Sequence, residues 1–144
     1  MFRGEYQHTL DAKGRVSLPA KFRADMTGRL VLVKGLEHCL YVYSADEFDG
    51  FVESLPSAED FDPRKSRLRR FFMAGSDDAE IDSAGRIKLP ANQIDYAGLK
   101  KDVAVIGNGN RVELWDSGAW ATYSSDEHGS IADLASELAT SGLL

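Results

Sequence analysis

DAKGRVSLPA, at residues 11–20, recurs as DSAGRIKLPA at residues 82–91, so one ten-residue segment is present twice. Six of the ten positions are identical, and Val16 is matched by the chemically similar Ile87. Agreement at this level is improbable by chance in a chain of 144 residues. Because self-similarity at a fixed period is typical of duplicated structural units, the sequence predicts two copies of one small fold.

The similarity extends beyond this segment at an offset of 72 residues, where LYVY at 40–43 aligns with VELW at 112–115. We therefore expect two copies of about 45 residues, joined by a connector and followed by a tail. The predicted segments are a first copy at 5–50, a helical connector at 51–75, a second copy at 76–122 and a helical tail at 123–144.

Each copy is predicted to consist mostly of β-strands. Residues 15–18 alternate apolar and polar side chains with the period of two that a half-buried strand requires. Residues 31–33 and 40–43 are rich in strand-forming residues, and Gly107 and Gly109 are expected to mark a turn. A short helix is expected to begin at Pro19. The predicted class is α+β, mainly β.

The connector carries the start and stop signals of two helices. Ser44 and Glu47 have the spacing of a capping box, and an amphipathic stripe begins at Phe48. A second helix is predicted to begin at Asp62-Pro63, to turn Leu68, Phe71 and Phe72 inward, and to end at Gly75. In the tail, apolar residues from Ile131 to Leu138 recur at helical spacing, which predicts an amphipathic helix that needs a partner surface.

A unit of this size buries too little apolar surface to be stable alone. The two copies must therefore share a core or pair with other chains. The duplication predicts pseudo-two-fold pairing inside one chain, although the sequence leaves open an exchange between chains.

The repeated segment has the form Asp-x-x-Gly-Arg followed by a proline four residues later. Its aspartate can close a turn by accepting backbone hydrogen bonds, and its glycine permits positive φ. Its arginine presents a rigid fork of donors that can bind a carboxylate, a phosphate or a base edge. The turn-forming residues are Asp11, Gly14, Asp82 and Gly85, and the arginines are Arg15 and Arg86.

Turn chemistry alone leaves two interpretations of this motif open. In the first, the Asp–Arg pairs only stabilise two hairpin turns. In the second, the arginines also bind a ligand, which is compatible with the first because the aspartate can build the turn while the arginine binds.

The net charge of −6 by itself argues against a nucleic-acid partner, but the charge is segregated along the chain. Residues 1–30 hold six Lys or Arg against three acids, and residues 64–70 hold five basic residues and no acid. Residues 112–144 hold six acids and no Lys or Arg. Segregation of this kind permits a basic binding face on an acidic protein.

The dense basic run from Arg64 to Arg70 has three possible roles. It is compatible with a solvated helix face, with a second nucleic-acid contact, or with an interface to an acidic neighbouring subunit.

The pattern F-x-G-x-x-x-H-x-L-D-x-K-G-R-x-x-x-P-x-x-F-R at residues 2–23 resembles the opening signature of the MraZ family, and DSAGRI-x-LP at 82–90 resembles its second signature. The resemblance covers roughly residues 1–125. It implies two SpoVT-AbrB domains with an AbrB-like swapped-hairpin fold, forming a pseudo-dimer within one chain.

The same resemblance implies a function. Members of the family are sequence-specific regulators of transcription that bind double-stranded DNA at short direct repeats upstream of their own cell-division and cell-wall gene cluster. It also implies repression, ring-like homo-oligomers and a location in the cytoplasm on the nucleoid. The operator sequence, the number of subunits and the sign of regulation stay open at this point.

Candidate DNA-binding residues follow from the basic side chains in and around the two motifs. We expect Arg3, Lys13 and Arg15 to form the main surface, with Arg86 and Lys88 secondary. Lys21 and Arg23 are weaker candidates. The second motif has Ala84 where the first has Lys13, and acids precede it at Asp77, Asp78 and Glu80, so the first copy is expected to contribute more phosphate contacts.

Other chemistries are disfavoured by the sequence. The spacing of Asp78, Glu80 and Asp82 is similar to the start of a calcium loop, but the twelfth position is Leu89 and not Glu, so no metal is expected. Neither a catalytic residue set nor a phosphate-binding loop is apparent. The expectation is a protein that is not an enzyme and has no cofactor, small-molecule substrate or membrane partner, with Cys39 a buried apolar side chain.

Two further classes compete with a DNA-binding regulator. An interaction module, for example an antitoxin-like partner or a structural ring, is compatible with an AbrB-type fold. An enzyme is the remaining alternative, disfavoured because the sequence presents no catalytic constellation.

Overall fold

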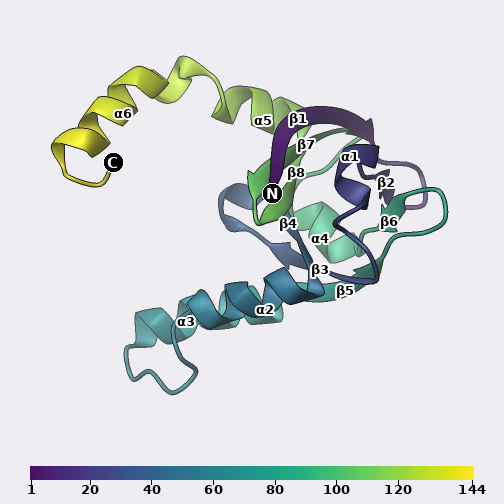
Figure 1. Ribbon diagram of the computed structural model, residues 1–144, viewed down its shortest axis with the longest axis horizontal. Helices are drawn as coiled ribbons and strands as arrows, with labels where there is room; N and C mark the ends of the chain where they lie inside the picture. Colours follow the sequence, from purple (N-terminus) through teal and green to yellow (C-terminus); the bar gives the residue numbers. More distant parts are fainter.

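The computed structural model describes residues 1–144, except for the side chain of His128, and has the predicted mixed α+β class. A six-stranded antiparallel sheet forms the centre, and a two-stranded ribbon lies beside it (Figure 1). The ribbon is at one end of the molecule, whereas two helical arms project from the opposite end.

The two copies contain the same strands and helices in the same order, except that the first copy has an additional 3-10 turn. The first copy comprises β1 (Phe2–Thr9), β2 (Arg15–Ser17), α1 (Ala20–Arg23), β3 (Arg29–Lys34), a 3-10 turn η1 (Leu36–His38), β4 (Leu40–Ser44) and α2 (Ala45–Ser54). The second copy comprises β5 (Ser76–Glu80), β6 (Arg86–Lys88), α4 (Ala91–Tyr96), β7 (Asp102–Gly109), β8 (Arg111–Asp116) and α5 (Ser117–Tyr123). Helix α3 (Pro63–Ala74) links them, and η2 (Asp126–His128) and α6 (Ile131–Thr140) follow.

The copies exchange strands within the chain. The strand order is β1-β7-β8-β4-β3-β5. The first strand of each copy therefore pairs with the third strand of the other copy: β1 with β7, and β5 with β3. At the centre of the sheet β4 pairs with β8, with Tyr41 opposite Glu113. In the ribbon β2 pairs with β6, with Val16 opposite Ile87. Both central pairs join equivalent positions, which places a pseudo-two-fold axis through them.

The central strands are buried on both faces because successive side chains point to opposite sides of a strand. Leu30 and Leu32 of β3 face the ribbon and contribute to one core, which also contains Val16 and Ile87. Val31, like Val33 and Tyr43, faces the other core. Helices α2 and α5 cover that second face through aromatic side chains such as Phe51 and Trp120.

The connector folds as the capping signals predict. The Ser44 hydroxyl accepts a hydrogen bond from the Glu47 N–H at the start of α2. Asp62 caps α3, Pro63 occupies its first turn, and Gly75 ends it. The expected inward position of Leu68 is wrong: its side chain is 41% exposed, whereas Phe72 is buried and packs on Phe51 of α2.

Several strands differ from the sequence prediction. Neither β1 nor β5 was expected as a strand, because their sequences, FRGEYQHT and SDDAE, are mostly polar. Both lie at the edges of the sheet, where polar side chains are tolerated. Gly107 lies inside β7 and not in a turn, and the backbone of Arg3 approaches it so closely that a Cβ atom would clash. The turn itself is Gly109-Asn110.

Among the helices described, none is long and apolar enough to cross a membrane.

Candidate nucleic-acid interface

The first Asp-x-x-Gly-Arg motif forms a tight turn between β1 and β2. The Asp11 carboxylate accepts hydrogen bonds from the N–H groups of Lys13 and Arg15, both at 2.9 Å, and from Arg15 Nε at 2.7 Å. Gly14 has φ +77°, a conformation that other residues rarely adopt. The aspartate therefore holds both the backbone of the turn and one edge of the Arg15 guanidinium.

The second motif repeats this geometry between β5 and β6. Asp82 accepts from the N–H groups of Ala84 and Arg86, both at 2.9 Å, and from Arg86 Nε at 3.0 Å. Gly85 has φ +79°. In both motifs only Nε of the arginine bonds to the aspartate, and the described side chains offer no hydrogen-bond partner to the two Nη groups.

These hydrogen bonds keep the two aspartates ionised. The N–H of Arg15 is the main cause of a lowered pKa at Asp11, with the Arg15 side chain and the Lys13 N–H adding to it. The N–H of Arg86 lowers the pKa of Asp82 in the same way. Each turn thus contains an ionised carboxylate that neutralises part of the positive charge of its arginine.

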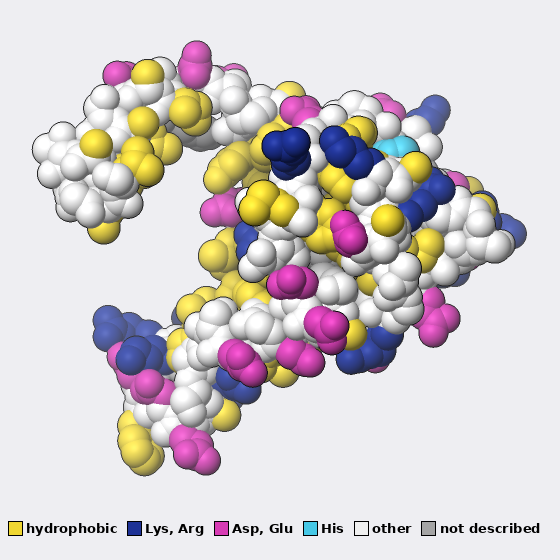
Figure 2. Space-filling view, in the orientation of Figure 1, with side chains coloured by type: hydrophobic (Ala, Val, Ile, Leu, Met, Phe, Trp, Pro, Cys, Tyr) yellow, Lys and Arg dark blue, Asp and Glu magenta, His cyan; other side chains and the backbone are white. Residues whose placement is uncertain are grey.

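The ribbon arranges the basic side chains on one face. Residues directly opposite each other in an antiparallel pair share a face, and so do residues two apart in one strand. Arg15 lies opposite Lys88, and Ser17 lies opposite Arg86. The intervening pair, Val16 and Ile87, is fully buried beneath them. The outer face of the ribbon therefore carries three cations above an apolar base, at the end of the molecule where Figure 2 shows Lys and Arg side chains.

Each turn is also attached to the other copy. The carbonyl oxygen of Gly14 accepts a hydrogen bond from the Leu89 N–H at 2.8 Å. The carbonyl oxygen of Gly85 accepts one from the Leu18 N–H at 3.0 Å. The two turns and the ribbon are consequently one connected unit, not two independent loops.

Strand exchange brings Arg23 of the first copy to the turn of the second. Its guanidinium lies against Gly85, where a Cβ atom would come within 2.3 Å of it, and its Nε donates to the Leu18 carbonyl at 2.8 Å. The equivalent residue of the second copy is Ile94, whose side chain lies against Gly14. The second turn, which lacks a counterpart of Lys13, therefore gains a cation from the other copy. The sequence analysis names Arg23 only as a weaker candidate, and no local sequence signal places it beside the second turn.

Burial is the main cause of a lowered pKa at His8, and the positive charge of Arg23 adds to it. A neutral imidazole is thus favoured beside the Arg23 guanidinium.

Other predicted residues are placed less centrally. Lys13 is exposed in the first turn, and Lys21 is exposed on α1. Arg3 is at the start of β1, opposite Asn108, whereas the turn at Asp11 follows the end of that strand. Asp11 is eight residue steps from Arg3 along mostly extended chain, a path of roughly 25 Å. The structure therefore does not bring Arg3 together with Lys13 and Arg15.

The basic run lies on α3, in the arm at the opposite end of the molecule from the ribbon (Figure 1). Arg64 pairs with Asp62 at 2.8 Å, and Lys65 pairs with Asp60 at 3.4 Å. Arg69 donates to the Pro56 carbonyl at 3.0 Å. This run is not continuous with the ribbon face within one chain.

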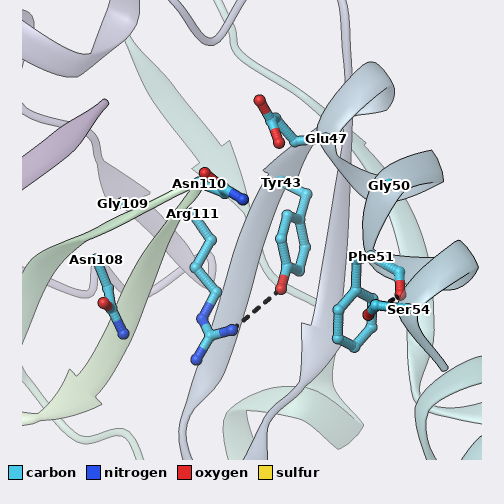
Figure 3. Close-up of a pocket in the computed structure, with 9 residues that line it drawn as sticks. All are labelled: Tyr43, Glu47, Gly50, Phe51, Ser54, Asn108, Gly109, Asn110 and Arg111. Atoms are coloured by element: carbon cyan, nitrogen blue, oxygen red, sulfur yellow. Dashed lines mark hydrogen bonds between the residues drawn. The ribbon is translucent and has the colours of Figure 1, made fainter. Parts of the chain in front are cut away.

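A hollow of about 570 Å³ lies between α2 and the β7–β8 turn (Figure 3). Its lining includes Arg111, which donates to the Tyr43 hydroxyl at 3.2 Å and to Glu113 at 2.8 Å. The guanidinium also stacks 3.6 Å from the centre of the Tyr41 ring. Arg111 of β8 thus contacts Tyr41 and Tyr43 of β4 and helps to hold the two strands together, and the residues that line the hollow form no catalytic arrangement.

The described side chains also contain no group of His, Cys, Asp and Glu that could hold a metal ion. Asp78 and Glu80, part of the calcium-like spacing, lie on the edge strand β5, where Asp78 pairs with Arg29. Cys39 is fully buried, and burial raises the pKa of its thiol.

Comparison with known proteins identifies the family. A family model described as "MraZ protein, putative antitoxin-like" matches residues 1–71 and again residues 72–140. The chain belongs to the MraZ family.

Curated relatives in this family match the chain over nearly its whole length. The transcriptional regulator MraZ of Acetivibrio thermocellus is 45% identical over 143 residues, which are 99% of this chain and 100% of the relative. The one from Alkaliphilus oremlandii is 41% identical over the same shares of both chains. The one from Thermoanaerobacter pseudethanolicus is 43% identical over 96% of each chain. These MraZ relatives are named as regulators and not as enzymes, in agreement with the sequence-based expectation that the chain is not an enzyme.

Proposed function

We propose that this MraZ-family chain is a sequence-specific DNA-binding regulator of transcription that contacts duplex DNA with the β2–β6 ribbon and its two turns. One observation carries the proposal: Arg15, Arg86 and Lys88 share the outer face of a two-stranded ribbon whose other face is buried. A two-stranded ribbon fits the major groove of B-DNA, and arginine and lysine are the side chains that most often bind guanine there.

The turns at either end of the ribbon supply the backbone contacts. Lys13 and Arg15 in the first turn, and Arg23 and Arg86 at the second, are positioned to bind phosphates. Because each Asp–Arg pair leaves the Nη groups of the arginine unpaired, the turn can be held by the aspartate while the arginine binds DNA.

The resemblance to the family supplies the finer parts of the proposal. The chain is proposed to have the swapped-hairpin fold of two SpoVT-AbrB domains and to form ring-like homo-oligomers. It is proposed to repress its own cell-division and cell-wall gene cluster from direct repeats upstream, on the nucleoid in the cytoplasm. Few cations per chain give weak binding at physiological salt, so several ribbons on several repeats would gain affinity through effective concentration.

A second candidate function is an interaction module that assembles without specific DNA. The antitoxin-like description of the family model and the two exposed helical arms favour it. Selectivity for DNA distinguishes the two candidates.

The test is binding of the full chain to a labelled duplex from just upstream of its own gene, with unrelated competitor DNA at two salt concentrations. Wild type is expected to bind selectively and more weakly at higher salt. Arg15→Ala is expected to cost about 1–3 kcal/mol, a roughly 5- to 150-fold loss of affinity. Lys88→Ala is the second variant, because its exposed side chain has no hydrogen bond to another described residue.

Arg3→Ala is the matched control, since it removes the same side chain from the far end of β1. We expect it to change affinity less than Arg15→Ala. If neither wild type nor any variant binds selectively while all remain folded, the interaction module replaces the regulator.

A further inference from the structure

The outer face of the ribbon departs from the pseudo-two-fold symmetry of the chain at one pair of positions. The axis passes through the middle residue pair of β2 and β6, so it exchanges Arg15 with Arg86. It also exchanges Ser17 with Lys88. The first exchange leaves an arginine in both places. The second sets a short hydroxyl side chain in one copy against a long cation in the other.

The two ends of this face consequently differ in charge. At the first end, beside the first turn, Arg15 lies opposite Lys88, and both side chains are cations. At the second end, beside the second turn, Arg86 lies opposite Ser17. The Lys88 side chain is exposed, and the described residues offer its ammonium group no hydrogen-bond or salt-bridge partner. Lys88 is therefore available to a ligand that approaches the first end.

The edge strands that lead into the two turns increase the difference. Strand β5, before the second turn, carries three exposed acids, and only Asp78 has a cationic partner, Arg29, among the described side chains. The acids are Asp77, Asp78 and Glu80, and the equivalent residues of β1 are the uncharged Tyr6, Gln7 and Thr9. Arg23 adds one cation beside the second turn, but it does not outweigh these acids. Phosphates are therefore attracted more strongly to the first end than to the second.

We propose that the difference between Lys88 and Ser17 gives the chain one direction on duplex DNA, so that Lys88 is a specificity-determining residue. This inference rests on the proposed function and deepens it. A lysine only donates hydrogen bonds, so the DNA under the first end must offer acceptors to two cations. Ser17 can donate or accept, and the DNA under the second end meets only one cation on the outer face.

Contacts to phosphates alone would not give a direction, because the phosphate backbone carries no sequence information. The outer face of the ribbon is the surface proposed to enter the major groove, where the donor and acceptor pattern differs between base pairs. A DNA site that satisfies both ends of the ribbon therefore has no two-fold symmetry. One good base contact discriminates by roughly 5- to 150-fold, which is the expected preference for one direction over the other.

Direction can be measured by cutting DNA from a reagent fixed at each turn. Ala12 and Ser83 are equivalent and exposed in the two turns, so Ala12→Cys and Ser83→Cys carry an iron–EDTA reagent at matched places. Cys39 is fully buried and should stay unlabelled. Each labelled full chain is bound at saturation to the duplex from upstream of its own gene, and the cuts are mapped on both strands. We expect the two labels to cut at different places, in the same order in every repeat.

The variant that tests the inference is Ser17→Lys with Lys88→Ser, made in both labelled chains. It moves the lysine from the first end to the second without changing composition or net charge. The fold should survive, because the register already places a lysine opposite an arginine at the first end, and circular dichroism checks it. The order of the two cuts is expected to reverse. Ser17→Lys alone makes the outer face symmetric and should give both orders.

Lys21→Ser is the matched control, because it replaces an exposed lysine on α1 and not on the ribbon. It should keep the wild-type order of cuts. The inference is overturned if the exchanged variant binds the duplex and also keeps the wild-type order, or if wild type itself cuts in both orders. Absence of selective binding by wild type would overturn the proposed function and this inference with it. Selective binding with an unchanged order would overturn the inference alone.

Discussion

The two Asp-x-x-Gly-Arg turns share a backbone but differ in the side chains that surround them. The first turn carries its own Lys13 and is packed by the apolar Ile94. The second has Ala84 instead of a lysine and is packed by the guanidinium of Arg23. Each turn therefore has one cation besides its motif arginine, but at the second turn that cation comes from the other copy.

This difference shows that charge cannot be assigned to a copy from the sequence alone. The expectation that the first copy contributes more phosphate contacts compared the charged residues in and around each motif. Arg23 makes the two turns more equal in charge, but it is itself a residue of the first copy. The two ends of the ribbon nevertheless differ, because Ile94 packs on the first turn and Arg23 packs on the second. An interface with a true two-fold axis matches a palindromic site, whereas unequal ends can give the chain a direction on DNA, which agrees with the direct repeats that we propose as its site.

The largest effect is expected from the buried pair that supports both turns. Ile87→Ala removes a fully buried side chain beneath the ribbon and should lower the free energy of unfolding by about 2–5 kcal/mol. Urea unfolding measures this change. Val16 and Ile87 are paired in the ribbon that joins both turns, so Ile87→Ala should weaken the DNA contacts of both turns. If only one turn lost its DNA contacts, the two turns would not depend on a common ribbon.

The contribution of Arg23 can be compared directly with that of Lys13. If each binds one phosphate, Lys13→Ala and Arg23→Ala should each weaken binding across all sequences and reduce the salt dependence by about one unit of slope. Titrations at several salt concentrations measure the slope. Lys21→Ala, on the same short helix as Arg23, is the control. An unchanged slope in Arg23→Ala would leave the first turn as the main phosphate contact.

A lysine can be added where the second copy lacks one. Ala84→Lys places a cation at the exposed position equivalent to Lys13, and it should raise affinity and increase the salt slope by up to about one unit. Stability should change little, because the Ala84 side chain is exposed and only its N–H is used by the turn. Weaker binding would indicate that the second turn does not approach the phosphates.

The smallest effects concern the pH dependence of the two turns. The pKa of Asp11 and of Asp82 is lowered in the folded state, so each carboxylate stabilises the fold above its unfolded pKa of about 4. That contribution is lost as the pH falls through the lower, folded pKa. Asp11→Asn and Asp82→Asn should therefore be less stable than wild type at pH 7, and the difference should shrink below about pH 4. Thermal unfolding across this range measures it, and a constant difference would show that ionisation of the two aspartates does not contribute to stability.

The features that the sequence predicts correctly depend on interactions between residues that are close together in the chain. Helices α2 and α3 begin directly after Ser44 and Asp62, because these capping side chains and Pro63 act on adjacent backbone groups. The ribbon strand β2 follows from the alternation at residues 15–18. The candidate site was predicted as far as Lys13, Arg15, Arg86 and Lys88, although their role in binding stays a prediction.

The features that could not be predicted depend on contacts between distant residues. Strand β5 has the polar sequence SDDAE, and only its pairing with β3 makes it a strand. The position of Arg23 beside Gly85 and the distance of Arg3 from the turns both follow from the exchange of strands. Leu68 has helical spacing with Phe72, but that spacing cannot show which side of α3 the rest of the chain covers.

The pairing of β1 with β7 also has a consequence for how the protein is made. Phe2 lies opposite Gly109, so β1 leaves the ribosome more than 100 residues before the strand that pairs with it. Contacts of such high sequence separation slow folding, because a long loop must close before they are gained. The half-chains at residues 1–71 and 72–140 each match the family but are not separate folding units. We expect the nascent chain to wait for its second half, with β1 unpaired and open to chaperones or to a neighbouring chain on the same messenger RNA.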